Sequence, residues 1–137
     1  MQFLNDFLIK IKFVIIFIFS ICITKILLKT MSLDSVIMKV RKISSLILSA
    51  SESEIPIERI HGWYLKLSSL LNINSCLTKS LSQKIIFSNF GFNFLVICGV
   101  RFDEESNFKG HAWLSYKNKI IFERNEDIKK YTESFRV

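Results

Sequence analysis

The stretch GHAWLSYKNKIIFE, residues 110–123, decides the fold expected for this chain. Apolar and polar residues alternate as far as Tyr116, and a second apolar run begins after Lys117-Asn118. This pattern is typical of two antiparallel strands joined by a tight turn, and it predicts a hairpin with strands over 110–116 and 119–124. His111, one of only two histidines in the chain, stands at the start of the first strand.

The sequence before the hairpin predicts one more strand and three helices. FNFLVICGV (92–100) is rich in β-formers and almost continuously apolar, as a central strand is, and 101–109 is expected to be a polar loop. Apolar residues recur at helical spacing over 32–49, 56–71 and 75–89. Ser32 suits the first N-cap, Pro56 the start of the second helix, and Gly91 the C-terminal cap of the third. Helices followed by a small antiparallel sheet predict an α+β fold.

The N-terminus is strongly apolar. FVIIFIFSICIT (13–24) carries no charge and is flanked by Lys10, Lys12 and Lys25. Even when extended to Leu28 it is shorter than the roughly 20 residues of a spanning helix. A membrane or partner contact through residues 7–28 is favoured, while a core helix and a signal peptide stay open. The expected organisation is an apolar helix over 1–30 and a globular domain over 31–137.

Composition narrows the function classes. The chain has 137 residues, enough for one modest core, and its net charge of +7 is dispersed rather than gathered into a basic stripe, so nucleic-acid binding is not expected. Three cysteines without a CxxC pair indicate a reducing, cytoplasmic setting, with membrane association possible through the apolar helix. A zinc site built from Cys76, Cys98, His61 and His111 is conceivable, but the ligand spacing does not favour it.

Cys76 is the best candidate nucleophile. It follows Ser75, the expected N-cap, so the free N–H groups and dipole of a helix start would stabilise its thiolate and a developing oxyanion. A histidine such as His111 would complete the ion pair and later protonate the leaving amine. Cys22 and Cys98 lie in apolar runs and are expected to be small buried hydrophobes, and His61 to be structural or superficial. The chain contains no phosphate loop, G-x-S-x-G elbow or H-E-x-x-H helix, so no cofactor or metal is predicted.

The strings NSCLTKSL (74–81), VICGVRF (96–102) and FKGHAWLSYKNKIIFE (108–123), in this order and at these spacings, resemble the transglutaminase-like leader peptidases of lasso-peptide biosynthesis. The resemblance spans roughly residues 56–123, and an apolar N-terminal helix is common in the stand-alone members of that family. It implies a transglutaminase-like, papain-like cysteine protease core. It also implies that Cys76 is the nucleophile, His111 the general base and acid, and Glu123, twelve residues on, the third member.

Two positions depart from the family pattern. The family usually has aspartate where this chain has Glu123, and a glutamate where it has Ser115. Asn125 and Asp127 are fallback partners for the histidine, since an amide can also orient an imidazole. Relatives of this size act on a precursor peptide together with a small winged-helix leader-binding protein and an ATP-dependent, asparagine-synthetase-like cyclase. Two alternatives stay open: a transglutaminase-like amidase or acyl transferase on another substrate, and a non-catalytic membrane-anchored scaffold.

The hairpin makes the third role testable, because side chains alternate between the two faces of a strand. A regular two-residue turn at 117–118 pairs Glu123 with Ala112 and removes it from the face of His111. A three-residue loop, 117–119, pairs Glu123 with Trp113 and places it on that face. We therefore predict a three-residue loop with Asn118 or Lys119 at positive φ, or a bulge in one strand.

Overall fold

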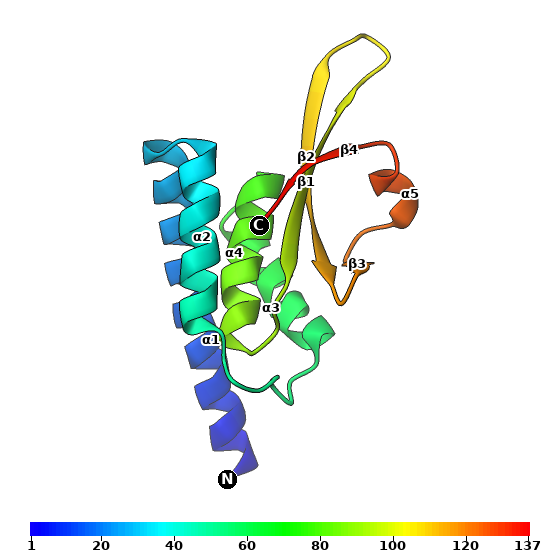
Figure 1. The fold of residues 1–137 in the computed structure, drawn as a ribbon. Helices are drawn as coiled ribbons and strands as arrows, with labels where there is room; N and C mark the ends of the chain where they lie inside the picture. Colours follow the sequence, from blue (N-terminus) through cyan, green and yellow to red (C-terminus); the bar gives the residue numbers. More distant parts are fainter.

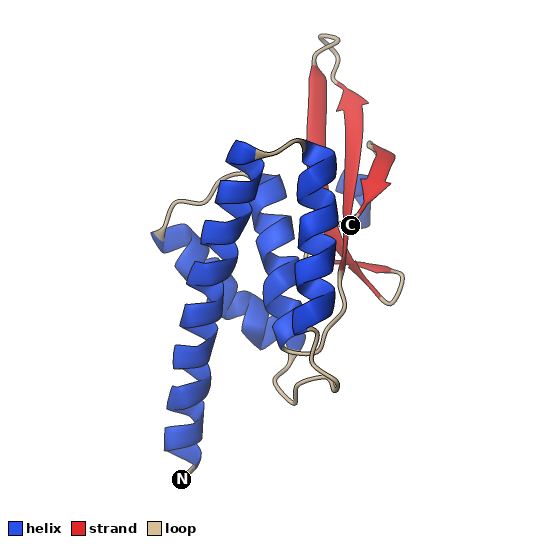
Figure 2. Cartoon of the chain, turned by 60° about the vertical axis from the view of Figure 1, so that its left-hand side comes forward, coloured by secondary structure: helices blue, strands red, loops and turns tan.

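The computed structural model describes all residues, 1–137. Four helices precede the sheet: α1 (Gln2–Thr30), α2 (Leu33–Ile47), α3 (Ile57–Leu70) and α4 (Cys76–Asn89). The strands are β1 (Leu95–Phe102), β2 (Phe108–Tyr116), β3 (Lys119–Ile121) and β4 (Thr132–Arg136), with the short helix α5 (Asn125–Ile128) between the last two. Helices α1 to α4 gather on one side of the sheet (Figures 1 and 2), which confirms the predicted α+β class.

The sheet is antiparallel with strand order β3-β2-β1-β4. β1 pairs with β2 along its whole length, from Leu95 opposite Ser115 to Phe102 opposite Phe108, so β1 is the central strand that the sequence predicted. One face of the sheet contributes Val96, Cys98, Ala112 and Leu114 to the main core under the helices. The other face carries a small cluster formed by Ile97, Trp113 and Ile128, and α5 covers it.

α4 is the central helix of the molecule. Every residue from Ser80 to Ser88 is buried, because α1 and α2 pack on one side of the helix and the sheet on the other. Its C-terminus is a Schellman motif: Gly91 has φ +84 and donates its N–H to Ser88, while Phe92 donates its N–H to Phe87. Gly91 is therefore the cap that the sequence predicted, and a Cβ there would lie 2.0 Å from the carbonyl oxygen of Ser51.

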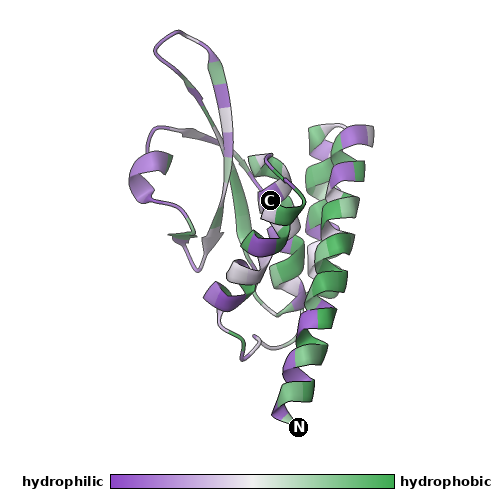
Figure 3. Cartoon of the chain, turned by 180° about the vertical axis from the view of Figure 1, so that it is seen from behind, coloured by the Kyte–Doolittle hydropathy of each residue, from purple (hydrophilic) through white to green (hydrophobic).

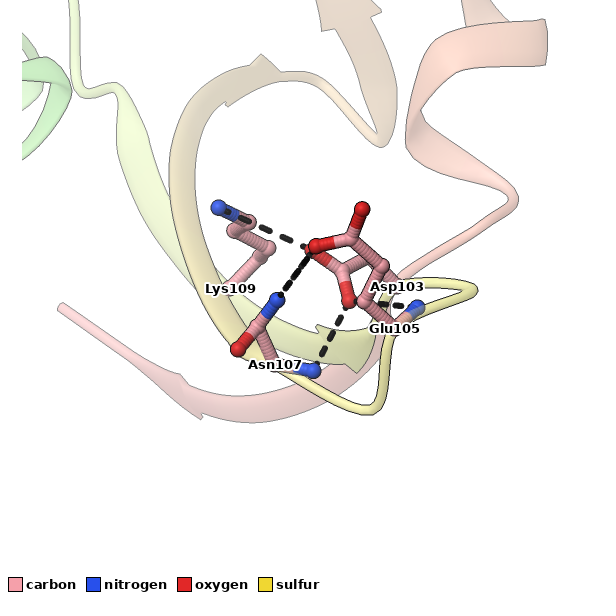
Figure 4. Close-up of polar contacts among 4 residues, drawn as sticks. All are labelled: Asp103, Glu105, Asn107 and Lys109. Carbon is pink, nitrogen blue, oxygen red and sulfur yellow. Dashed lines mark hydrogen bonds and ion pairs between the residues drawn. The ribbon is translucent and has the colours of Figure 1, made fainter.

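The loop predicted over 101–109 is shorter in the structure. Arg101 and Phe102 extend β1, and Phe108 and Lys109 begin β2, so only residues 103–107 form the turn. The Asp103 carboxylate organises this turn (Figure 4): it accepts the backbone N–H groups of Glu105 at 3.1 Å and Asn107 at 2.8 Å, and it pairs with the Lys109 ammonium at 3.7 Å. Because these bonds hold the turn tight, strand pairing reaches residues that the polar sequence suggested were loop.

α1 is both a core helix and an exposed one. The side chains of Phe13, Phe17 and Ile21 belong to the main core, and Phe17 meets the ring of Tyr64 edge-on at 5.4 Å. The N-terminal end of α1 extends beyond the other helices (Figure 2), and the outward face of α1 remains strongly apolar (Figure 3). Cys22 lies on this exposed face, so the expectation that it is buried was wrong: it follows the inward-facing Ile21 by one position, 100° around the helix.

Candidate active site

Cys76 is the first residue of α4, as predicted. The hydroxyl of Ser75 caps the helix by accepting the backbone N–H of Thr78 at 3.3 Å. Cys76 is half-buried and packs against the edge of the main core. The first N–H groups of this 14-residue helix have no partner within the helix and lie beside Cys76. They can therefore stabilise a thiolate or an oxyanion.

α4 is joined to β2 next to the histidine. The buried hydroxyl of Ser80 donates a hydrogen bond to the carbonyl oxygen of Ala112 at 3.1 Å. Ser80 lies four residues after Cys76, so both side chains point from one face of the helix, one turn apart. This bond fixes the first turns of α4 against the strand segment that carries His111. Cys76, His111 and Glu123 consequently line one cavity of about 290 Å³.

His111 and Glu123 form the closest polar contact of the site. The imidazole Nε2 lies 2.7 Å from the Oε2 of Glu123, and both side chains are about 70% buried, with exposed fractions of 27% and 30%. Aromatic rings flank the imidazole, with Tyr131 at 5.3 Å and Trp113 at 6.1 Å between ring centroids. Nε2 is occupied by Glu123, so Nδ1 is the nitrogen left to exchange a proton with a substrate or a thiol. Cys76 is not hydrogen-bonded to His111 in the structure.

Glu123 reaches the histidine through an irregularity after β3, which is closer to the predicted alternative of a strand bulge than to the predicted three-residue loop. The turn has two residues, with Tyr116 opposite Lys119, so the predicted three-residue loop was wrong. Lys117 and Asn118 both have positive φ, +48 and +63, as two-residue hairpin turns of type I′ require. β3 ends at Ile121, and Phe122 then adopts a left-handed φ of +66. That residue redirects the chain and brings Glu123 to His111.

The fallback residues lie elsewhere. Asn125 and Asp127 are exposed residues of α5 and neither bonds to His111. Ser115 is buried on β2 and lines a separate cavity of about 470 Å³ beside α5. The residues of the conceivable zinc site do not form a group of ligands: no cluster of three or more His, Cys, Asp or Glu side chains is present.

The two cysteines near the core differ in chemistry. Cys98 is buried on β1, and burial, with a smaller contribution from the neighbouring Cys76, raises the pKa of its thiol to about 12. It is therefore a neutral thiol at physiological pH and fills core space, as predicted. Cys76, at the helix start and open to the cavity, is the thiol that a substrate can reach.

Three further residues of the cavity wall were missed or misread. His61, expected to be structural or superficial, borders the cavity: its Nδ1 lies 2.9 Å from the Oε1 of Gln83, and its ring stacks on Phe122 at 3.5 Å. Burial lowers the pKa of His61, and the hydrogen bond to Gln83 opposes this only in part. Gln83 could have been found from the sequence, since it follows Cys76 by seven residues and therefore lies on the same face of the predicted helix. No pattern in the sequence distinguished Phe122.

Comparison with known proteins agrees with the fold. No curated protein and no solved structure gives a significant match to the chain. Residues 40–136, from the middle of α2 to the end of β4, match the family described as the transglutaminase-like superfamily. Domains of this kind are typically those of cysteine proteases or acyltransferases. Because the match covers more than half of the chain, this protein belongs to the transglutaminase-like superfamily.

Proposed function

We propose that this protein is a cysteine peptidase that removes the leader from a lasso-peptide precursor. The observation that carries the catalytic part is the His111–Glu123 pair, at 2.7 Å, in the cavity that also contains Cys76. The choice of substrate is supported by the three sequence strings around Cys76, Gly99 and His111 that resemble the leader peptidases.

In the proposed reaction the Cys76 thiolate attacks the carbonyl carbon of the scissile peptide bond. A carbon–sulfur bond forms, and N–H groups at the start of α4 hold the oxyanion. The imidazolium of His111 gives its proton to the leaving amine as the carbon–nitrogen bond breaks, which leaves an acyl-thioester. His111 then takes a proton from water, the hydroxide attacks the thioester, and Cys76 departs as the thiolate.

Glu123 orients the imidazole and stabilises its charged form through Nε2. The longer side chain of glutamate is compatible with this role, because the carboxylate reaches Nε2 at ordinary hydrogen-bond distance. The proposed partners are the precursor peptide, a winged-helix leader-binding protein, and an ATP-dependent cyclase that closes the macrolactam from the released product. The proposed location is the cytoplasm, with α1 in contact with the membrane.

The first test is a cleavage assay with the purified protein, the precursor encoded beside its gene and the neighbouring leader-binding protein. Cys76→Ala is expected to abolish cleavage. Glu123→Gln is expected to lower kcat/KM by about 10²–10⁴-fold, because the imidazole loses the charge that stabilises its protonated form. Cys22→Ala, a change of the same kind at an exposed cysteine outside the cavity, is the matched control and should keep full activity.

An intact precursor in the wild-type reaction, while a homologous peptidase cuts it in the same mixture, would exclude leader cleavage. The fold also supports an amidase, in which water attacks the thioester of another substrate, or an acyl transferase, in which an amine attacks it. Transfer of the acyl group to an added primary amine, lost in Cys76→Ala, would identify that activity. A protein that neither cleaves nor transfers would favour the scaffold alternative.

A further inference from the structure

The end of β3 breaks the alternation of its side chains. Pairing of Ile121 with Leu114 places Ile121 on the face of the sheet that packs on α4. In a regular strand Phe122 would follow on the opposite face, beside Trp113, and Glu123 would return to the α4 face opposite Ala112. His111 shares a face with Trp113, so a regular strand would separate Glu123 from His111.

The structure shows the opposite placement. The ring of Phe122 lies on the α4 side, where its centroid is 5.9 Å from that of Phe87 and 6.2 Å from that of Phe94. Two consecutive side chains, Ile121 and Phe122, thus face the helices, and Glu123 is released to His111. The residue that makes this possible is Phe122 itself, whose φ of +66 lies in the left-handed region.

A left-handed backbone costs about 1–2 kcal/mol in a residue other than glycine, so other contacts must hold it. The closest is the stack on His61, with ring centroids 3.5 Å apart and planes 2° from parallel. His61 is held in turn by Gln83, a buried residue of α4, whose amide oxygen lies 2.9 Å from Nδ1. The same helix that carries Cys76 therefore fixes the segment that carries Glu123.

The protonation state of His61 fits this arrangement. Its pKa is lowered by burial, so the ring is neutral near pH 7. The amide oxygen of Gln83 accepts a hydrogen bond, so Nδ1 carries the proton of the neutral ring. His61 forms no salt bridge, and the face of its neutral ring packs against the Phe122 ring.

We propose that Phe122 and His61 are positioning residues: their stack holds the end of β3 in the left-handed conformation that directs Glu123 onto Nε2 of His111. The catalytic consequence rests on the function proposed above, whereas the structural consequence, the Glu123–His111 bond, does not. Neither residue needs to touch the reacting atoms.

The test compares four variants by side-chain ¹⁵N NMR of His111 and by precursor cleavage. Phe122→Val is expected to restore a regular strand, because a β-branched residue is strongly disfavoured at positive φ. The Nε2–H tautomer of His111 should then lose its fixed signature, and kcat should fall by about 10²-fold with KM little changed. Phe122→Tyr should keep both properties. Phe108→Val, at an exposed position beside the 103–107 turn, is the matched control.

Phe122→Gly separates the stack from the backbone, because glycine adopts positive φ without strain but offers no ring. In Phe122→Gly, His111 should lose the fixed Nε2–H tautomer that it keeps in Phe122→Tyr. If Phe122→Val does not fold, the comparison of Phe122→Gly with Phe122→Tyr tests the positioning role. Wild-type tautomer and kcat in both Phe122→Gly and Phe122→Val would overturn the proposal. If the wild-type protein cleaves nothing, the proposed function fails, and the NMR comparison still tests the positioning role.

Discussion

Gly99 stands opposite His111 in the pairing of β1 with β2, and the space above it is occupied by the indole of Trp113. A Cβ at this position would lie 2.7 Å from the Cη2 atom of Trp113 and 3.0 Å from the carbonyl oxygen of Thr132. Trp113 is buried and lies beside the imidazole, so a change in its packing reaches the site directly.

Gly99→Ala is therefore expected to destabilise the protein by about 1–3 kcal/mol and to lower cleavage activity, because the indole must move against backbone on the other side. Urea denaturation measures the first effect. Gly110→Ala is the matched control. Gly110 is next to His111 in the same strand, and a Cβ added there would have no atom within 4 Å. The free energy of unfolding of this variant should therefore stay within about 0.5 kcal/mol of the wild-type value. Equal stability of the two variants would contradict this account.

At the residue scale the sequence identified side chains whose chemistry depends on local structure. Ser75 as a cap, Cys76 at the helix start and the spacing of His111 from Glu123 all follow from short patterns. The left-handed Phe122 does not, because its conformation is stabilised by His61 and Gln83, which lie far away in the chain. The predicted three-residue loop failed for this reason: the irregularity needed by Glu123 lies after β3 rather than in the turn.

At the scale of the element, α4 contains a buried lysine. The ammonium of Lys84 donates to the carbonyl oxygen of Phe94 at 2.6 Å. Burial, with a smaller contribution from Arg41, lowers its pKa to about 8 from a model-peptide value of 10.5. Below pH 8 the group is charged in both the folded and unfolded states, and the folded state bears the whole cost of burying the charge.

Above pH 8 the folded protein releases this proton while the unfolded chain still binds it, so the contribution of Lys84 to the free energy of unfolding rises with pH. The full rise to pH 10.5 is roughly 3 kcal/mol. Cys98, with its raised pKa, acts in the opposite sense above pH 9, so the comparison is best made from pH 7.5 to 9.

Urea unfolding across this range should show that wild type gains stability with pH relative to Lys84→Met, in which the titrating group is absent. Lys66→Met, at an exposed lysine of α3, should follow the wild-type profile. Parallel profiles for wild type and Lys84→Met would show that Lys84 does not titrate in this range.

The elements themselves were largely predictable. Helical periodicity and caps placed α2, α3 and α4 within two residues of their ends, because each segment signals its own boundaries. α5 and β4 were not predicted: α5 is a single turn, and β4 is a polar strand whose pairing with β1 is a long-range contact. The apolar run over 92–100 gave the position of β1 but not its extension through Arg101 and Phe102, which depends on the 103–107 turn.

At the scale of the whole molecule, the outer helical layer combines an apolar surface with positive charge. α1 is long and apolar enough to cross a membrane, so the expectation of a segment shorter than a spanning helix was wrong. A third of its most apolar window is nevertheless buried against the rest of the protein. Residues 1–48 contain seven basic and two acidic side chains, so they carry +5 of the net +7. This combination suits an anionic bilayer that receives the outward face of α1 while the inward face stays packed on α4.

We expect the protein to co-sediment with vesicles that contain anionic lipids. Ile15 and Ile18, with exposed fractions of 63% and 52%, lie on the outward face, and the double change Ile15→Glu and Ile18→Glu should weaken binding without loss of folding. Leu70→Glu, at a residue of α3 that is 79% exposed, should bind as wild type does. If the protein does not bind vesicles and light scattering shows dimers that the double change disrupts, a second copy of the chain, rather than a bilayer, covers the outward face of α1.

Phe13 shows that α1, whose outer face is exposed, is also part of the core. Its ring meets Trp63 edge-on at 5.3 Å and lies 6.3 Å from Phe90, so α1 joins α3 to the end of α4. In the proposed membrane-associated peptidase, a protease that removed α1 would also remove the hydrophobic support of α4, the helix that presents Cys76.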